Sequence, residues 1–409
     1  MPQALPLSGF RVLELGAYIS GPYAGAILGS LGADVVKVEP PQGGDAFRRN
    51  VGTGSPYFAQ YNAGKRSIAI DLKKPEGIAL VKALLPRFDV VIENSRPGKM
   101  AQLGLGPEDC KAVNPEIIYA SVSGFGDSGP LRDHAAYDSM GQSIGGYYSI
   151  MNDPAQARLT GTCIADLVTG MVNAMGIMAA LAGRGNGNGG GTVMKTSLVE
   201  AMSTVTIDAM TQYYEMGESP TRQTRHPQAQ NFCLLTSSGD SITLHLSSSE
   251  KFWRCLVAAM ERPDLLQDAR FTRYGDRMAN FWDLKPIVEA EFLKRSRADW
   301  EHRLTVEDVP FAPVLTMQEV AEHEQTTHLE LIETADDGHV LVRPPWRIND
   351  ARPHRSSPTP VVGEHTVEVA SEVLEQRAIA DLLAARVIMQ AADPNASRDA
   401  PIRLHKAAE

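Results

Sequence analysis

The sequence has few cysteines and no excess of positive charge. Its four cysteines, Cys110, Cys163, Cys233 and Cys255, lie far apart and form no C-x-x-C pair, so neither a disulfide framework nor a zinc site is indicated. The formal net charge at pH 7 is −10, which argues against nucleic acid or an anionic membrane surface as the main partner. We expect no metal site, no nucleic-acid partner and no membrane partner.

The sequence pattern also lacks targeting signals and membrane spans. The N-terminus has no basic region followed by an apolar core, and no uninterrupted apolar run reaches membrane-spanning length. We therefore expect a protein of a reducing, cytoplasmic compartment of bacterial type. With 409 residues and a hydrophobic content of 43%, the chain is long enough for two domains with sizeable cores.

Several catalytic signatures are absent. The chain has no G-x-S-x-G motif, and residues 323–328 read His-Glu-Gln-Thr-Thr-His, one residue too long for the H-E-x-x-H pair of zinc proteases. Serine hydrolysis and metal hydrolysis are therefore disfavoured. Scattered histidines such as His134 and His245 are more typical of structural or exposed positions than of catalysis.

A β-α-β unit begins the chain. Residues 10–16 alternate as a strand, residues 21–31 are small and apolar as in a helix, and residues 34–39 form a second strand. Glu39 ends that strand where a dinucleotide-binding protein places its ribose-binding acid, but the first turn lacks the G-x-G-x-x-G spacing. A dehydrogenase is therefore disfavoured, although Ser20 and the N–H groups of the turn can still face a phosphate or an adenine nucleotide.

The next elements predict an open α/β sheet. Strand and helix candidates follow at short intervals, at residues 67–72, 75–85, 89–93 and 116–123. This order predicts a mostly parallel, Rossmann-like sheet. Two basic turns, residues 62–66 and 94–99, lie next to strand ends, where such sheets bind ligands. The alternative is that their Lys and Arg side chains are solvated surface charges.

The chain is organised around residues 159–184. From Leu167 to Ala182 nearly every residue is apolar or small, which predicts a central helix buried on all sides. Asp166 stands on its first turn, against the positive end of the helix dipole. By position alone Asp166 is either an N-cap residue or a functional carboxylate. The small residues that let neighbouring backbones approach closely are Gly170, Ala174, Gly176, Ala179 and Ala180.

Three segments interrupt the regular pattern. Residues 124–138 are rich in glycine and turn formers and lead toward Asp166, so we expect a functional loop there. The glycine and asparagine run at 185–191 is tempting as a phosphate cradle, but we expect a flexible hairpin at the far end of the central helix. A linker-like composition at 218–227 indicates that a second unit follows.

A series of short motifs covers almost the whole chain. They read Gly-Pro-Tyr-Ala-Gly at 21–25, Leu-Gly-Ala-Asp-Val-Val-Lys-Val-Glu-Pro at 31–40, Asn-Ala-Gly-Lys-Arg-Ser-Ile-Ala-Ile-Asp-Leu at 62–72, Glu-Asn-Ser-Arg-Pro-Gly at 93–98, Ser-Gly-Phe-Gly at 123–126, Tyr-Asp at 137–138, Asp-Leu-Val-Thr-Gly at 166–170, Pro-Phe-Ala-Pro-Val at 310–314 and Gly-Glu-His-Thr at 363–366. In content and order they resemble the class III coenzyme A transferases, the family of formyl-CoA transferase and carnitine-CoA transferase.

This resemblance implies an enzyme that transfers coenzyme A from an acyl-CoA thioester to a small carboxylic acid. Asp166 falls on the family's nucleophile, which forms anhydride and aspartyl-CoA thioester intermediates, and no tightly bound cofactor is expected. The resemblance also implies a large CoA-binding α/β domain from residues 1–215 and 335–409, a smaller α+β middle domain from 216–334, and an interlocked homodimer.

The resemblance further identifies the expected CoA contacts. They are Ile19, Ser20, Pro40, Asp71, Leu72, Lys73, Asn94, Ser95, Arg96, Gln102 and Tyr137. At Gln102 many relatives carry a basic residue that meets a CoA phosphate. The glycine loop of formyl-CoA transferase is not recognisable between residues 225 and 240, so oxalate and formate are not indicated. Succinyl-CoA is a common donor among relatives.

Two alternatives remain open. The α-methylacyl-CoA racemases are similar to this chain and move an α-proton between a His and the Asp at the position of Asp166. Where they carry Gly-His-Asp, this chain has Ala136-Tyr137-Asp138, so transfer is favoured over racemisation. A non-catalytic CoA-binding protein would keep its ligand after loss of Asp166 and show no turnover.

Overall fold

The chain forms two compact units. The computed structural model describes residues 5–392, apart from 50–54, 154, 160 and 187–189. The first unit consists of Met1–Tyr147, Leu159–Ile207 and Gln325–Glu409, and the second of Tyr148–Arg158 and Asp208–Glu324. The middle of the expected hairpin at 185–191 lies outside the described residues.

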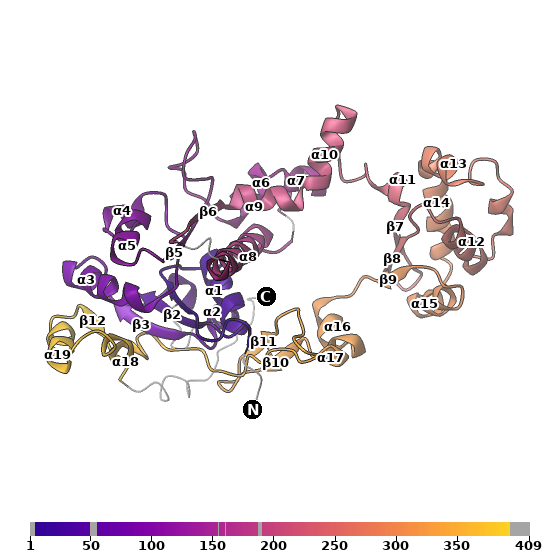
Figure 1. Ribbon diagram of the computed structural model, residues 1–409. Coiled ribbons are helices and arrows are strands. Elements are labelled where there is room, and N and C mark those ends of the chain that lie inside the picture. The colour runs from indigo at the N-terminus through magenta and orange to yellow at the C-terminus, as the bar shows by residue number, and fades with distance from the viewer. Residues whose placement is uncertain (1–4, 50–54, 154, 160, 187–189, 393–409) are drawn as a thin grey trace. The chain divides into compact units, whose positions relative to one another are not determined.

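The first unit is built on a seven-stranded sheet (Figure 1). Its strands lie in the order β12-β3-β2-β1-β4-β5-β6, and all neighbours are parallel except β12, which is antiparallel to β3. This confirms the predicted α/β class with an open, mostly parallel sheet. The strands are β1 (Arg11–Glu14), β2 (Asp34–Glu39), β3 (Arg66–Ile70), β4 (Val90–Glu93), β5 (Ile118–Ser123), β6 (Val193–Ser197) and β12 (Ile388–Met389).

Helices cover both faces of this sheet. Side chains alternate along each strand, so Val12 packs in one cluster with α1 and α8, whereas Leu13 packs in another with α3, α5 and α19. The first unit includes the helices α1 (Ser20–Ser30), α2 (Pro56–Asn62), α3 (Pro75–Leu84), α4 (Lys99–Gln102), α5 (Pro107–Val113), α6 (Asp138–Ile144), α8 (Ile164–Gly185), α9 (Leu198–Val205), α18 (Thr366–Ala370) and α19 (Gln376–Ala384).

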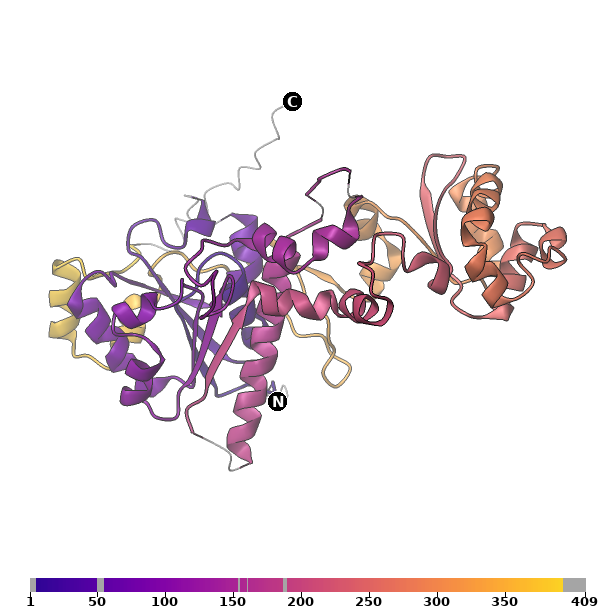
Figure 2. The same cartoon turned by 90° about the horizontal axis from the view of Figure 1, so that it is seen from above.

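The central helix α8 is the long helix beside the sheet in Figure 2. Ala174, Ile177 and Leu181 are buried against the sheet and α1, but Met171 and Met175 are 40% and 64% exposed. The expectation of a helix buried on all sides is therefore wrong, because one stripe of α8 faces away from its neighbours. By length and composition alone α8 could cross a membrane, although the sequence led us to expect no apolar run of that length. The core helix of a soluble protein passes the same test.

Close approach between α8 and α1 depends on Gly170, as predicted. A Cβ atom added at Gly170 would lie 2.9 Å from the carbonyl oxygen of Ser20 and 3.0 Å from Cβ of Tyr23. These distances leave no room for a side chain. The first turn of α8 is thereby brought next to the first turn of α1, where Ser20 lies.

The second unit has its own core around an antiparallel sheet. Trp253, Phe281, Phe292 and Trp300 are fully buried there, and the rings of Phe292 and Trp300 stack at 4.0 Å between centroids. The elements are β7 (Asn231–Leu235), β8 (Ser241–His245), β9 (Phe311–Pro313), α11 (His226–Ala229), α12 (Glu250–Ala259), α13 (Tyr274–Ala279), α14 (Phe281–Phe292), α15 (Arg297–Val306) and α16 (Met317–Glu322).

A few short elements complete the chain. β10 and β11 form an antiparallel pair in the first unit. The remaining elements are α7 (Tyr147–Met151), α10 (Ile207–Met216), α17 (Glu324–His328), β10 (Ile332–Thr334), β11 (Val340–Val342) and the 3-10 turns Ala46–Arg48, Leu85–Arg87 and Pro263–Leu266.

Candidate active site at the carboxyl edge of the sheet

Two cavities open where the parallel strands of the first unit end, the edge at which open α/β sheets bind ligands. The Asp166 cavity has a volume of about 210 Å³ and is lined by Tyr18, Ser20, residues 94–97, residues 122–124, residues 134–137, Asp166 and Leu198. The Lys73 cavity has a volume of about 240 Å³ and is lined by residues 15–17, residues 38–40, Asp45 and residues 70–73. The β1–α1 turn supplies residues to both cavities.

Asp166 lies on the first turn of α8, as predicted, and is half-buried. Burial, followed by the nearby charge of Asp138, raises the pKa of Asp166 to about 7, and a hydrogen bond from the Ser20 side chain opposes this rise. Near neutral pH the carboxyl group is therefore divided between its two protonation states. Such a perturbed carboxyl group in a cavity is typical of a functional site.

The N-cap role does not fall to Asp166. Oδ1 of Asp138, the first residue of α6, accepts the backbone N–H groups of Ala165 at 2.9 Å and Asp166 at 3.2 Å. Oδ2 of Asp138 is bound by the amide of Gln142, which also donates to the Thr162 carbonyl group at 3.1 Å. Asp138 thus satisfies the free N–H groups of α8, and the Asp166 side chain is left to face the cavity.

Aromatic side chains pack against the first turn of α8. Phe47 and Tyr61 form a cluster with Ile19, and Cys163 and Leu167 pack against it. Burial raises the pKa of Tyr61, and contacts with Cys163 and the charge of Asp166 raise it further. Asp166 therefore has apolar and neutral phenolic groups on one side, which keeps water away from it.

Asn94 fixes the turn that faces Asp166. Its Oδ1 accepts the N–H group of Ala17 at 2.9 Å, and its Nδ2 donates to the Ala17 carbonyl group at 2.7 Å and to the Ser20 hydroxyl group at 3.2 Å. Ser20 and Asp166 line the same cavity, and the Ser20 hydroxyl group lowers the pKa of Asp166, so Asn94 holds this hydroxyl group in the wall that faces the carboxyl group. Asn94 is thus placed as a positioning residue for the site.

The structure brings most of the expected CoA contacts to these two cavities. Ser20, Asn94, Ser95, Arg96 and Tyr137 line the Asp166 cavity, and Pro40, Asp71, Leu72 and Lys73 line the Lys73 cavity. Ile19 instead lies in the aromatic cluster. Gln102 is exposed at the end of α4 and lines neither cavity.

Sequence reasoning missed three groups at this edge. Tyr18 lines the Asp166 cavity with its ring edge-to-face against Tyr137 at 6.0 Å. His134, which the pattern placed among structural or exposed histidines, also lines this cavity. The capping role of Asp138 gave no local signal, because Asp138 and Ala165 are separated by 27 residues; the predicted functional loop at 124–138 was the available hint.

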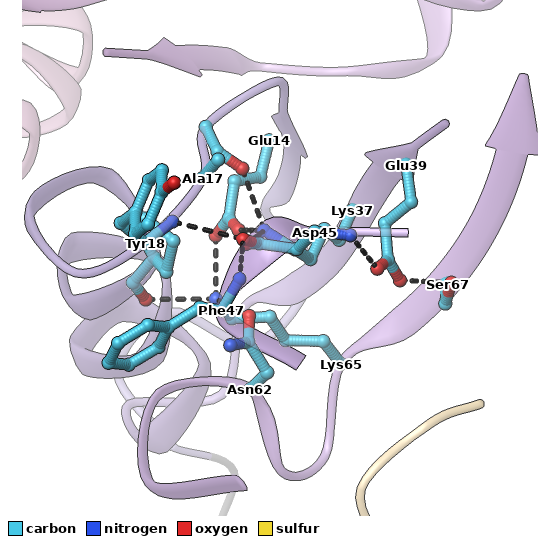
Figure 3. A network of polar contacts seen from close by, with 12 residues as sticks. Glu14, Ala17, Tyr18, Lys37, Glu39, Asp45, Phe47, Asn62, Lys65 and Ser67 are labelled. Atoms are coloured by element: carbon cyan, nitrogen blue, oxygen red, sulfur yellow. Dashed lines mark hydrogen bonds and ion pairs between the residues drawn. The ribbon is translucent and has the colours of Figure 1, made fainter. Parts of the chain in front are cut away.

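Glu39 and Lys65, which the sequence placed at possible ligand-binding positions, are buried in a charge cluster (Figure 3). Oε1 and Oε2 of Glu39 are bound by Arg48, each at 2.7 Å, and Oε1 also accepts from Ser67 at 2.6 Å. Burial opposes ionisation, but these partners lower the pKa of Glu39 to about 2. Glu39 is thus occupied by protein groups and is not a ribose-binding acid.

Lys65 is not a solvated surface charge either. Its ammonium group is buried and donates to Glu14, to the Pro22 carbonyl group and to Asn62 at 2.7, 2.8 and 3.0 Å. Burial lowers the pKa of Lys65 to about 8.

Among the residues that the structure describes, no cluster of three or more His, Cys, Asp or Glu side chains is placed to hold a metal ion.

Comparison with known proteins identifies the family. The family model described as CoA-transferase family III matches residues 7–366. A succinate–glutarate CoA-transferase from Agrobacterium fabrum is 32% identical over 385 residues, covering 90% of this chain and 96% of that protein. A succinyl-CoA:glutarate CoA-transferase from Homo sapiens is 30% identical over 401 residues, covering 94% of this chain and 90% of that protein.

Solved structures give the same result. The crystal structure of a CAIB/BAIF family protein from Brucella suis has a TM-score of 0.80 and 32% identity, covering 91% of this chain and 100% of that chain. A hypothetical protein from Mycobacterium tuberculosis has a TM-score of 0.81 and 28% identity, covering 89% of this chain and 99% of that chain. The chain with Asp166 at the carboxyl edge of its sheet therefore belongs to CoA-transferase family III and is an enzyme of the class III CoA-transferase type.

Proposed function

We propose that the enzyme transfers coenzyme A from an acyl-CoA thioester to a free carboxylic acid through covalent intermediates on Asp166. The observation that carries this proposal is the half-buried carboxyl group of Asp166, with a pKa of about 7, in a cavity lined by Ser20, Asn94 and Tyr137. A carboxylate is a weak nucleophile in water, and removal of its hydration in such a cavity makes attack on a thioester feasible.

The proposed reaction has four steps. The Asp166 carboxylate attacks the thioester carbonyl carbon, and the C–S bond breaks to give a mixed anhydride and the CoA thiolate. The thiolate attacks the Asp166 carbonyl carbon, which releases the donor acid and leaves an aspartyl-CoA thioester. The acceptor carboxylate attacks this thioester, and the C–S bond breaks to give a second anhydride and the CoA thiolate. The thiolate then attacks the acceptor's carbonyl carbon and displaces the Asp166 carboxylate. Acyl-CoA leaves and Asp166 is a carboxylate again.

The two cavities suggest how one long ligand is held. We propose that the Lys73 cavity takes the nucleotide end of CoA and that the Asp166 cavity takes the thioester. Lys73 would contribute a cation for a phosphate, while Asn94 and Ser20 fix the wall beside the reacting carbon. One relative is named for succinate and glutarate and another for succinyl-CoA and glutarate, so succinyl-CoA as donor and a short dicarboxylic acid as acceptor are the proposed substrates.

The proposed assembly is an interlocked homodimer, in the cytoplasm and without a membrane or nucleic-acid partner. The exposed apolar stripe of α8 at Met171 and Met175 supports a protein partner for this helix, since stripes of this kind mark interaction surfaces. Light scattering after size exclusion would give the mass of the assembly. A Met175→Asp variant is expected to weaken a dimer that uses this stripe.

A trapping experiment tests the proposed chemistry. The enzyme is incubated with a panel of acyl-CoA thioesters and treated with hydroxylamine or borohydride, and peptides containing Asp166 are analysed by mass spectrometry. A hydroxamate or a reduced product at Asp166 is expected with the true donor, and Asp166→Ala should give none. Binding of CoA without any adduct or turnover would support a non-catalytic CoA-binding protein instead.

His134 gives one specific reason to test racemisation. It lines the Asp166 cavity, so a histidine and an aspartate face the same space even though position 137 is tyrosine. Two-base proton transfer would exchange the α-proton of a 2-methylacyl-CoA with deuterated solvent. Exchange that is lost in His134→Gln, without any adduct at Asp166, would favour the racemase over the transferase.

A further inference from the structure

The β1–α1 turn is the wall shared by the two cavities. Gly16 and Ala17 line the Lys73 cavity, whereas Tyr18 and Ser20 line the Asp166 cavity. The turn leads directly into Ser20, the first residue of α1, so its conformation bears on where the Ser20 hydroxyl group lies. The side chains that hold the turn in place come from the buried charge cluster in Figure 3.

Two buried lysines hold the two ends of the turn. The ammonium group of Lys37 lies 2.9 Å from Oε1 of Glu14, 2.7 Å from the Gly16 carbonyl oxygen and 3.0 Å from Oδ2 of Asp45. Lys65 binds Oε2 of the same Glu14 and the carbonyl oxygen of Pro22, in α1. The contacts with Glu14 and Gly16 are hydrogen bonds, whereas the contact with Asp45 is an ion pair and Oδ2 of Asp45 accepts no hydrogen bond from the described residues.

Asp45 connects this cluster to the backbone of the turn. Its Oδ1 accepts the N–H groups of Tyr18 at 3.2 Å and Phe47 at 2.9 Å, while its own N–H group donates to Glu39 at 2.9 Å. Tyr18 has a φ of 63°, in the left-handed region, which costs a non-glycine residue about 1–2 kcal/mol. The hydrogen bond from its N–H group to Asp45 helps to hold this conformation.

Burial makes this an unusual way to hold a turn. Glu14 and Lys37 are fully buried and Asp45 is 3% exposed, and buried ion pairs contribute little net stability after desolvation. The geometry of these ion pairs is better explained by the backbone that they hold in place. Lys37 binds the carbonyl oxygen of Gly16, and Asp45 accepts the N–H group of Tyr18. The cluster thus specifies one conformation of residues 16–18.

We propose that the Lys37–Asp45 ion pair is a positioning pair that sets the β1–α1 turn so that the Ser20 hydroxyl group meets Asp166. This inference rests on the proposed function of Asp166. Lys37 and Asp45 act through Tyr18 and Gly16, which precede Ser20 in the turn. Loss of the pair is expected to leave the sheet intact and to displace Ser20.

Titration of Asp166 without turnover gives the first test. A water-soluble carbodiimide with an added amine modifies protonated carboxyl groups, and peptide mass spectrometry follows the modification of Asp166 against pH. The groups that affect the pKa of Asp166 or are affected by it are Ser20 from α1, Tyr61 from α2 and Asp138 from α6. The other titratable or charged side chains that line its cavity are Tyr18, Arg96, His134 and Tyr137. Because the Ser20 hydrogen bond lowers the pKa of Asp166, Ser20→Ala is expected to move the midpoint to higher pH.

Asp45→Asn should move the midpoint in the same direction as Ser20→Ala. Direct electrostatics cannot produce this result, because removal of a negative charge makes a neighbouring acid easier to ionise. The double variant should show no further shift, as expected when both changes remove one interaction. The matched control is Asp34→Asn, since Asp34 is ion-paired at the other end of β2 and its loss should leave the midpoint unchanged.

Turnover gives the second test. Asp45→Asn is expected to lower kcat for acyl transfer by about tenfold or more, and Asp34→Asn to leave it unchanged. Circular dichroism checks that each variant folds. If Asp45→Asn does not fold, Asp45→Glu takes its place, because it keeps the charge but displaces the acceptor of the Tyr18 N–H group. A wild-type midpoint and kcat in the folded Asp45 variant would overturn the inference. A wild-type enzyme that titrates as described but transfers no acyl group would instead overturn the proposed function.

Discussion

The carboxylate of Asp138 accepts the backbone N–H groups of Ala165 and Asp166 at 2.9 and 3.2 Å, so a residue of α6 caps the helix that carries the reactive carboxyl group. This contact has two effects. It frees the Asp166 side chain from capping, and it places a second carboxylate close enough to raise the pKa of Asp166. The same residue thus orients the helix and tunes its functional group.

Substitution of Asp138 by asparagine should separate these two effects. The amide oxygen of Asp138→Asn can still accept from Ala165, but its NH2 group cannot accept the hydrogen bond from Gln142, so we expect a stability loss of about 0.5–1.5 kcal/mol. The negative charge is lost, so the pKa of Asp166 should fall from about 7. If the ionised form of Asp166 reacts, the acid limb of kcat should move to lower pH, as measured by initial rates between pH 5 and 9.

A neighbouring acid supplies the control. Asp133 lies in the same loop, is exposed and pairs with Arg132. Asp133→Asn should leave both the acid limb and the thermal unfolding temperature unchanged. An acid limb in Asp138→Asn that stays where it is in the wild type would show that Asp166 does not control the rate through its ionisation.

The sequence allowed the sheet, the central helix and the position of Asp166 to be predicted, because each depends on local periodicity. The buried charge cluster was not predicted. Lys37 and Glu39 lie within the strand sequence Asp-Val-Val-Lys-Val-Glu, and both are 0% exposed. Central strands of a parallel sheet are buried on both faces, so charged residues inside such a strand were the available signal. Their partners, Glu14, Asp45 and Arg48, come from other segments and could not be assigned by pattern.

The exposed stripe of α8 was missed for a related reason. A run of apolar and small residues predicts burial but does not say which face has a partner in the same chain. The Asp138 cap joins residues distant in sequence, and no spacing rule relates them. Most residues predicted from resemblance do line the two cavities. They follow the ends of strands, and in a parallel sheet these strand ends lie at the same edge.

The ionisation of Asp166 should also affect stability. The folded-state pKa, raised from 3.8 to about 7, means that the native protein holds a proton that the unfolded chain releases between these pH values. The free energy of unfolding therefore falls as pH rises through this range. Asp166→Asn removes the penalty, so its gain in stability over the wild type should grow from pH 4 to pH 7, by at most about 4 kcal/mol. Urea denaturation at several pH values measures this gain, and a difference that is constant with pH would contradict it.

Lys73 and Lys74 form a matched pair for testing the Lys73 cavity. Lys73 lines the cavity, whereas the ammonium group of Lys74 donates to the carbonyl groups of Ala385 and Arg386. Lys73→Ala should raise KM for acyl-CoA several-fold with little change in kcat, because a phosphate contact is made equally in the ground and transition states. The effect should shrink at high salt.

Lys74→Ala is expected to leave KM unchanged at every salt concentration. Initial rates at varied acyl-CoA concentration, in low and high salt, measure both variants. Equal effects of the two substitutions would mean that general surface charge, rather than a site in the Lys73 cavity, attracts the ligand.

Gly25 tests the charge cluster through packing. A Cβ atom at Gly25 would lie 2.1 Å from Oε2 of Glu14 and 3.2 Å from Nζ of Lys65. Gly25→Ala must therefore displace the carboxylate that pairs with both Lys37 and Lys65. Disruption of a buried ion pair costs about 3–5 kcal/mol, so we expect a loss of that order in the free energy of unfolding, measured by urea denaturation.

Gly183→Ala provides the opposite expectation with the same chemical change. Gly183 lies in α8, and no atom would lie within 4 Å of an added Cβ atom there. Replacement of an unconstrained helical glycine by alanine stabilises a helix by about 0.5–1 kcal/mol, so this variant should be more stable than the wild type. If Gly25→Ala did not lower the free energy of unfolding either, the Glu14 carboxylate could move without loss of stability. The cluster would then not be the rigid support that its contacts with Gly16 and Pro22 indicate.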